Sequence, residues 1–485
     1  MAKRKRTAGS NSALTPQVQP SKKAKPSSSR PISSPVTLQI ITGSYDRVLH
    51  GFTATISPDD KVEFADTFLF NAHGSAIRCL AISPPSAPEP GKLQKVMLAS
   101  GSSDERINVY HLSAHPPKAK DKDVLSTIAP RKIQENSKNR ELGTLLHHSS
   151  TVTALSFPTK SKLISASEDS TIAVTRTRDW SLLSSIKVPK PKPQGRPSGD
   201  TAALDGTPAG VNDFAVHPSM KLMISVSKGE RSMRLWNLMT AKKAGVLNFS
   251  REILQEAGES KHSPGEGRKV VWGTTEEGDE FCVGFDRDVI VFRMDSTPKC
   301  RVMPEPRRKV HQLCYVPVES TAESSLLAVS TEDGRILFFS TKTDDLSTTE
   351  SGTDKKTEKL PVAKLVAQLG GKEAGISGRI KDFSVCRVSG DEGDVLYISA
   401  GGSDGKVRLF RLNTEDLTGA MREKAAKQIG KLLGTYETQN RITCMNAFTM
   451  IPRPEGVEDS DDEFHEDEDE NDSEDDEEDE DEDEE

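Results

Sequence analysis

The chain has 485 residues, of which 34% are hydrophobic and 29% are charged, so it is longer than one ordinary domain and poorer in core-forming residues than most globular proteins. Its formal charge of −9 conceals a separation of charge. From residue 458 to residue 485, 23 of 28 positions are Asp or Glu, whereas residues 1–457 hold 65 Lys and Arg against 51 Asp and Glu, a net charge of +14. The sequence therefore predicts a basic body that carries an acidic tail.

Two classes of protein are excluded by the apolar pattern. No apolar run approaches the roughly 18 residues that cross a bilayer, and the first residues are basic and polar, without the apolar stretch of a secretory signal. We therefore expect neither a membrane protein nor a secreted one. The six cysteines never reach CxxC spacing, which favours reduced, mostly buried thiols over a zinc site or a disulfide frame, and no cofactor is indicated. They are Cys79, Cys282, Cys300, Cys314, Cys386 and Cys444.

Both ends of the chain are predicted to be disordered. Residues 1–35 and 452–485 lack periodic hydrophobicity, so neither segment can bury enough surface to offset the entropy of ordering. The first segment contains two basic clusters at the spacing of a bipartite nuclear import signal, which an import receptor would bind. An ordinary solvated basic tail is the alternative. The clustered residues are Lys3, Arg4, Lys5, Arg6, Lys22, Lys23 and Lys25.

The acidic tail has three readings. The first is a solubility tail, the second is a mimic of nucleic acid that binds a basic partner, and the third is a mask over the basic surface of this protein. Ser460 and Ser473 are each followed by three acidic residues, which is typical of sites for an acid-directed kinase. Phosphorylation there would deepen a charge that already exists.

Residues 36–451 repeat one pattern seven times. A tight turn ends in an acid, and apolar residues follow at three, five and often six positions later, which directs alternate side chains to one face of a strand. A short alternating strand precedes most of the turns, often after a His. Each repeat is thus predicted as strand, strand, turn, strand. The seven turn acids are Asp46, Asp104, Asp169, Glu230, Asp286, Asp333 and Asp404.

The first repeat lacks an innermost strand, because residues 22–35 upstream of it are basic, polar and rich in Pro. Residues 440–448 have the alternation of an inner strand, yet no further strand follows them. We expect this C-terminal strand to complete the first repeat, since it would remove an exposed sheet edge that invites aggregation.

Several of these motifs resemble degenerate WD repeats, namely residues 100–104, the His pair at 147–148 and residues 235–237 around Trp236. The resemblance implies an all-β fold, a seven-bladed WD-repeat β-propeller. Spacings of 47 to 71 residues between turn acids exceed the roughly 40–45 residues of a WD blade. We expect the excess in rim insertions between blades, at 113–141, 190–209, 341–361 and 413–430, with helical spacing from 416 to 433.

Catalytic motifs are not found. No GxxxxGK[ST] loop, HExxH helix or GxSxG elbow is present. His73 with Ser100 and His148 with Ser165, each beside a turn acid, could form hydrolytic triads. The trio recurs, however, and recurrence favours the hydrogen-bonded brace found in WD-repeat blades, so no catalytic residue is predicted. Trp180 is interpreted either as a binding hot spot or as a packed outer-strand residue.

A closer resemblance is carried by residues 145–155, 163–169 and 216–238, which are similar to the family of PAK-interacting WD-repeat proteins, whose fungal members are the maintenance-of-killer WD-repeat proteins. The similarity is close over residues 70–250 and extends to residues 251–435 only at the level of blades. It implies a nuclear and nucleolar, non-catalytic, monomeric scaffold in assembly of the large (60S) ribosomal subunit and in rRNA processing. Its partners would be pre-ribosomal particle proteins, basic ribosomal proteins and pre-rRNA.

The same resemblance implies a second hypothesis, a signalling adaptor that binds and inhibits a PAK-type protein kinase. The basic clusters, the acidic tail and the basic insertions favour the assembly scaffold, because an assembly factor works among RNA and highly basic proteins.

Replacing the seven clustered Lys and Arg residues with Ala removes seven of the eight positive charges in residues 1–35. We expect a fluorescent fusion of this variant to leave the nucleus, because an import receptor recognises clustered charge. Unchanged nuclear enrichment would show that import uses another route or a carried partner.

Overall fold

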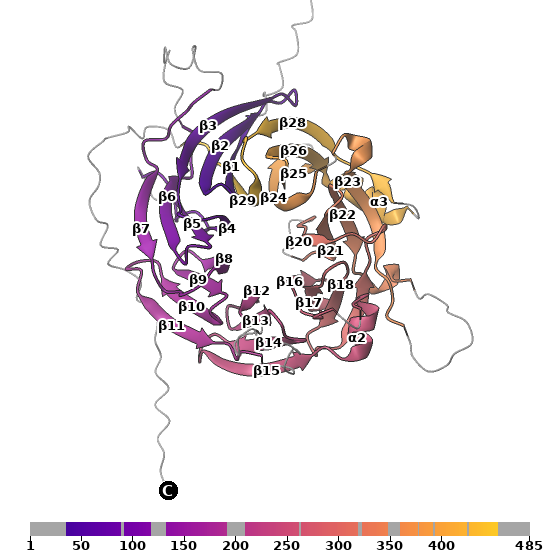
Figure 1. Cartoon of the computed structure of the whole chain (residues 1–485). Helices are drawn as coiled ribbons and strands as arrows, with labels where there is room; N and C mark the ends of the chain where they lie inside the picture. The colour runs from indigo at the N-terminus through magenta and orange to yellow at the C-terminus, as the bar shows by residue number, and fades with distance from the viewer. Residues whose placement is uncertain are drawn as a thin grey trace, which may run out of the picture.

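The computed structural model describes residues 35–453 apart from 89–91, 118–131, 192–208, 261–262, 319–322, 348–358, 377, 391–392 and 424–425. Within these residues seven sheets stand around a common axis as the blades of a propeller (Figure 1). The prediction of an all-β, seven-bladed propeller is confirmed. The predicted basic segment and acidic tail lie outside the described residues except at their inner ends. No helix in the described ranges is long and apolar enough to cross a membrane.

Each blade has an inner strand near the axis and an outer strand at the rim (Figure 1). From the inner to the outer strand, the first blade consists of β29 (Ile442–Thr449), β1 (Val36–Ser44), β2 (Val48–Ile56) and β3 (Val62–Asn71). The second to fourth blades consist of β4 (Ile77–Ile82), β5 (Lys95–Ser102), β6 (Ile107–Ser113), β7 (Arg140–Leu145), β8 (Val152–Thr159), β9 (Lys162–Ser167), β10 (Thr171–Arg176), β11 (Leu182–Lys187), β12 (Val211–Val216), β13 (Leu222–Ser227), β14 (Ser232–Asn237) and β15 (Lys242–Asn248).

The fifth to seventh blades follow the same order. They consist of β16 (Lys269–Thr275), β17 (Gly278–Gly284), β18 (Val289–Arg293), β19 (Pro298–Val302), β20 (Val310–Tyr315), β21 (Leu326–Thr331), β22 (Arg335–Ser340), β23 (Lys364–Gly370), β24 (Ile380–Gly390), β25 (Gly393–Gly402), β26 (Lys406–Asn413) and β28 (Lys431–Glu437). Short elements in the connections are α2 (Arg251–Glu256), α3 (Thr414–Arg422), β27 (Lys427–Gln428) and the 3₁₀ turns η1 (Thr343–Asp345) and η2 (Lys372–Ala374).

The ring closes where the two ends of the chain meet. The inner strand predicted at 440–448 is present as β29, which runs antiparallel to β1 with Ile40 opposite Ala447. Ile442 and Met445 are almost fully buried between the first and seventh blades. Because β29 pairs with β1, the inner edge of the first blade is covered in the same way as the inner edges of the other blades.

The core is divided among the boundaries between blades. The described residues form seven hydrophobic clusters, and each cluster joins two adjacent blades. The cluster between the seventh and first blades, for example, contains Phe52, Leu409 and Tyr436, and the rings of Phe52 and Tyr436 stack with centroids 4.2 Å apart. Each blade is therefore stabilised only by its neighbours, so closure of the ring supports all of them.

The insertions are not placed as expected. Three of the four, at 113–141, 341–361 and 413–430, lie inside blades, between the third and the outer strand, and only 190–209 connects two blades. Of the helix expected from 416 to 433, only α3 forms, and it ends at Arg422. The segment from Lys431 forms β28 instead, because it supplies the outer strand that pairs with β26. Sheet completion thus overrides the helical spacing.

Each insertion inside a blade reaches the outer strand of the preceding blade. Ile133 forms a parallel bridge with Asp66 of β3, and Val362 forms a parallel bridge with Arg301 of β19. In the same manner β27 pairs in parallel with β23. These short pairings cover the rim edges of the first, fifth and sixth blades, and the insertions therefore protect edge strands that would otherwise be open.

A chain that ends at residue 439 lacks β29 and exposes the inner edge of β1. We expect it to lose about 5 kcal/mol of stability through lost apolar burial, and its melting transition should fall or lose cooperativity. A chain that ends at residue 453 lacks the acidic tail but keeps β29, so it is the matched control and should melt as the full chain does. Equal melting curves for all three chains would contradict the closure argument.

Candidate interaction surface

The seven turn acids lie on one face of the propeller, in the connections between the second and third strands of the blades. We call this face the turn face. The connections that lead into the inner strands lie on the same face, since His73 and His148, which precede β4 and β8, contact turn acids. The turn face is therefore built from two connections per blade, and loops held on a rigid scaffold are the usual place for binding residues.

The two predicted His braces come together in the second and third blades. His73 Nε2 lies 2.8 Å from Ser100 Oγ, and its Nδ1 lies 3.2 Å from the Asp104 carboxylate. His148 has the same arrangement, with Nε2 2.8 Å from Ser165 Oγ and Nδ1 3.2 Å from Asp169. Each His thus links an inner connection, a second strand and a turn within one blade.

These trios have the connectivity of a hydrolytic triad, but both serines are inaccessible. Ser100 is 0% exposed and Ser165 is 1% exposed, and both imidazole rings are fully buried. A substrate carbonyl cannot reach either hydroxyl, so the geometry favours the brace. Burial lowers the pKa of His73, which keeps its ring neutral. Burial alone would raise the pKa of Asp169, but its hydrogen bonds with His148 and Thr171 hold that pKa well below the usual range.

In other blades an Arg takes the place of the His. Glu230 pairs with Arg234, four residues later on β14, and Asp404 pairs with Arg408 in the same way at 2.7 Å. Both Arg side chains are at most one-tenth exposed. Sequence reasoning missed these pairs, although an Arg four residues after the turn acid is visible in both repeats. Trp236 is buried in the fourth blade and donates its indole N–H to Ser225 Oγ at 2.8 Å.

The remaining turn acids meet backbone or several cations. Asp46 accepts a hydrogen bond from the Arg441 backbone N–H at 3.2 Å. Asp286 lies 3.2–3.7 Å from the side chains of Arg268, Arg287 and Lys309. Asp333 pairs with Arg335 at 2.8 Å. Within the described residues every turn acid therefore has a polar partner on the turn face.

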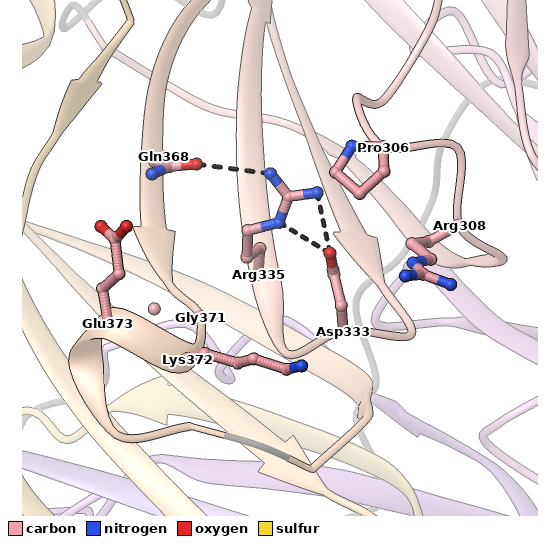
Figure 2. Close-up of a pocket in the computed structure, with 9 residues that line it drawn as sticks. Pro306, Arg308, Asp333, Arg335, Gln368, Gly371, Lys372 and Glu373 are labelled. Atoms are coloured by element: carbon pink, nitrogen blue, oxygen red, sulfur yellow. Dashed lines mark hydrogen bonds and ion pairs between the residues drawn. The ribbon is translucent and has the colours of Figure 1, made fainter.

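A cavity of about 270 Å³ opens beside the Asp333–Arg335 pair of the sixth blade, between the connections that join this blade to the fifth and to the seventh. Figure 2 shows the pair between Gln368 on one side and Pro306 and Arg308 on the other. Arg335 Nη1 also donates to Gln368 Oε1 at 3.4 Å, so this guanidinium is held by partners on two sides. Lys372 and Glu373 belong to the same lining, so three cationic and two acidic side chains border the cavity.

Polar side chains also link the inner strands of adjacent blades, which sequence reasoning missed. Lys269 of β16 lies 3.6 Å from Asp213 of β12, and Gln312 of β20 donates to Asp382 of β24 at 3.0 Å. Burial raises the pKa of both carboxyl groups. No three His, Cys, Asp or Glu side chains converge as metal ligands anywhere in the described part of the chain.

The other predicted residues fall into two groups. Trp180 packs against the cluster between the second and third blades, which favours its role as a packed residue over a binding hot spot. All six cysteines are free thiols, and five of them are buried. The import residues in 1–35 and the two serines at 460 and 473 lie outside the described residues.

The repeats and the closed seven-bladed ring define a WD-repeat protein, and the family model of the WD domain, G-beta repeat, matches residues 139–174, from β7 to β10. Protein MAK11 of Saccharomyces cerevisiae is 26% identical over 78% of each chain. The p21-activated protein kinase-interacting protein 1-like proteins of Danio rerio and Xenopus laevis are 22% and 21% identical over 84% and 87% of this chain, and over 80% and 84% of their own. Over most of its length the chain is therefore similar to MAK11 and to the p21-activated protein kinase-interacting protein 1-like proteins.

His148→Ala removes the central member of the brace in the third blade and leaves Ser165 Oγ without its partner. We expect a loss of about 2–4 kcal/mol in the free energy of unfolding, measured by urea denaturation, because buried polar groups lose their hydrogen bonds. Ser149→Ala is the matched control, since Ser149 is exposed and only its backbone N–H contacts Asp169. Equal stabilities of the two variants would show that the brace contributes little.

Proposed function

We propose that this protein is a non-catalytic scaffold in nucleolar assembly of the large (60S) ribosomal subunit and the associated rRNA processing. The family supports a WD-repeat scaffold, and the separation of charge carries the finer assignment. A body of net charge +14 can dock on phosphate-rich RNA, while a tail with 23 acidic residues can bind a basic ribosomal protein. Nuclear import through the basic clusters would deliver the protein to the nucleolus.

The positions of the chain ends support a division of labour between the faces. The Met450 N–H donates to the Thr37 carbonyl at 2.8 Å, so the two charged segments are attached side by side. Both attachment points lie at the ends of β1 and β29 opposite the turn between β1 and β2. The turn face is thus free of both attachment points, and a partner bound by the tail and a partner on the turn face would meet opposite faces.

A second candidate function is a signalling adaptor that binds and inhibits a PAK-type kinase. The observation that favours it is the name of the vertebrate relatives, which describes proteins that interact with p21-activated kinase. The adaptor hypothesis does not explain the basic body or the acidic tail, so the assembly scaffold is the better account of the charge.

Depleting the protein from cells that express it should lower the ratio of large to small ribosomal subunits and leave large-subunit precursors unprocessed. Sucrose-gradient profiles measure the ratio, and the protein should sediment with precursor particles at low salt and leave them as salt rises, since both contacts are electrostatic.

The adaptor hypothesis predicts a different outcome, which is a normal subunit ratio together with raised kinase activity. An unchanged ratio without co-sedimentation at low salt would reject the assembly role.

A further inference from the structure

One register position on the turn face is cationic in four adjacent blades. The residue directly before the inner strand is Ala76, Thr151 or Gly210 in the second to fourth blades. In the fifth, sixth, seventh and first blades it is Arg or Lys. These cations are Arg268 before β16, Lys309 before β20, Arg379 before β24 and Arg441 before β29.

The backbone shows that these positions are equivalent. In six blades the carbonyl of this residue accepts an N–H from the turn between the second and third strands, as from Ser103 to Ala76 and from Ser403 to Arg379. In the fifth blade Arg268 instead donates its N–H to Gly284 at 2.8 Å. Lys381 adds a further cation at a bulge of β24, two residues after Arg379. We call Arg268, Lys309, Arg379, Lys381 and Arg441 the cationic arc.

The acidic residues nearby are too few to neutralise the arc. Asp286 is the common partner of Arg268 at 3.2 Å and Lys309 at 3.6 Å, and Arg287 lies 3.7 Å from the same carboxylate. Arg379 pairs with Glu332 at 3.0 Å. Among the described residues no carboxylate lies within 4.0 Å of the Lys381 or Arg441 side-chain nitrogens. The arc therefore retains excess positive charge at a partly exposed surface.

The electrostatic consequence is visible at two neighbouring groups. Burial and the adjacent cations, first of all Lys381 and Lys309, lower the pKa of His311 to about 4. Burial, Arg379 and Arg441 likewise lower the pKa of Lys381. A protein surface that keeps like charges this close is adapted to a ligand that neutralises them.

We propose that the cationic arc binds the phosphate backbone of single-stranded RNA. This inference deepens the assembly role proposed above and rests on it for the kind of RNA. Three of the five residues are Arg, whose planar guanidinium donates two N–H groups to phosphate oxygens in a bidentate manner. The arc also extends outward. Arg308, which precedes Lys309, and Lys372 both line the cavity beside the Asp333–Arg335 pair of the sixth blade.

An exposed aromatic ring distinguishes RNA from an acidic peptide. Tyr45, in the turn of the first blade, is 57% exposed, and the Arg441 guanidinium lies 5.6 Å from its ring centroid. A cation beside an exposed aromatic ring allows a base to stack while the backbone phosphate is bound, which an acidic peptide does not require.

The test uses the purified full chain and a fluorescein-labelled single-stranded RNA of about 20 nucleotides, with the dissociation constant measured by anisotropy over a series of KCl concentrations. One variant, the arc variant, replaces all five residues of the cationic arc with Gln, and it should weaken binding at least tenfold near 0.1 M KCl. Its substitutions are Arg268→Gln, Lys309→Gln, Arg379→Gln, Lys381→Gln and Arg441→Gln. The slope of log Kd against log [KCl] should fall by about two or more, since each lost phosphate contact removes roughly 0.7.

A matched control removes the same charge from the face opposite the turn face. It carries Lys61→Gln, Lys160→Gln, Lys162→Gln, Arg178→Gln and Lys221→Gln. All five residues are exposed at the other ends of the strands, four in connections and Lys162 at the start of β9. We expect its affinity to change less than about threefold, because long-range attraction is screened beyond roughly 10 Å at this salt concentration. Equal losses in the two variants would overturn the proposal, as they would indicate attraction by net charge only.

Two more variants keep the result interpretable. If the arc variant with its five substitutions unfolds, a double variant takes its place. Lys381→Gln with Arg441→Gln removes only the two cations that have no carboxylate partner among the described residues, and the slope of log Kd against log [KCl] should then fall by about one. Tyr45→Ala should weaken RNA binding about fivefold or more at an unchanged salt slope. Affinity unaltered by both variants would also overturn the proposal.

The ligand class is tested by competition with poly-glutamate. If the protein binds poly-glutamate more tightly than RNA, and the arc variant loses that binding, the surface belongs to an acidic peptide and the RNA proposal is rejected. These measurements use purified components, so they are independent of the subunit ratio after depletion. If the purified protein fails to bind RNA but its depletion still lowers the ratio of large to small ribosomal subunits, the RNA proposal is wrong and the assembly role stands.

Discussion

Pairing of β29 with β1 is the interaction on which the rest of the structure depends. The hydrophobic clusters of the described residues each lie between two blades, so a blade has a complete core only when both neighbours are in place. Cys444 of β29 belongs to the cluster with the second blade, whereas Ile442 and Met445 belong to the cluster with the seventh. One strand from the far end of the chain therefore completes two boundaries, and it also fixes Arg441, the residue before it, on the turn face.

The two faces of the propeller carry out different tasks. The insertions inside the second, sixth and seventh blades leave from the face opposite the turn face and pair with the rim strand of the preceding blade. Asp60, in the short connection between β2 and β3, reaches Arg411 and Lys431 of the seventh blade in a comparable way. Cross-blade contacts on that side link neighbouring blades, whereas the turn face carries, besides its braces, cations that have no carboxylate partner among the described residues.

Much of the fold could be predicted from the sequence, because a turn acid followed by alternating apolar residues depends only on neighbours within one repeat. The missing inner strand of the first repeat was visible for the same reason. The location of the insertions could not be predicted, since the pairings of Ile133 with Asp66 and of Val362 with Arg301 join segments with no shared pattern. The contacts of Lys269 with Asp213 and of Gln312 with Asp382 were likewise invisible, because they depend on how neighbouring inner strands face one another.

The cationic arc is distinguished by its asymmetry. In six blades the carbonyl before the inner strand accepts the same backbone hydrogen bond, and Ala76 or Thr151 meets that requirement as well as Arg379 does. Backbone pairing therefore does not require Arg or Lys at this position, and four cations that share few carboxylates repel one another. Their restriction to consecutive blades makes a continuous surface rather than a ring, which matches a linear polyanion that crosses part of the face. The departure from sevenfold equivalence is thus the feature that separates a binding requirement from a folding requirement.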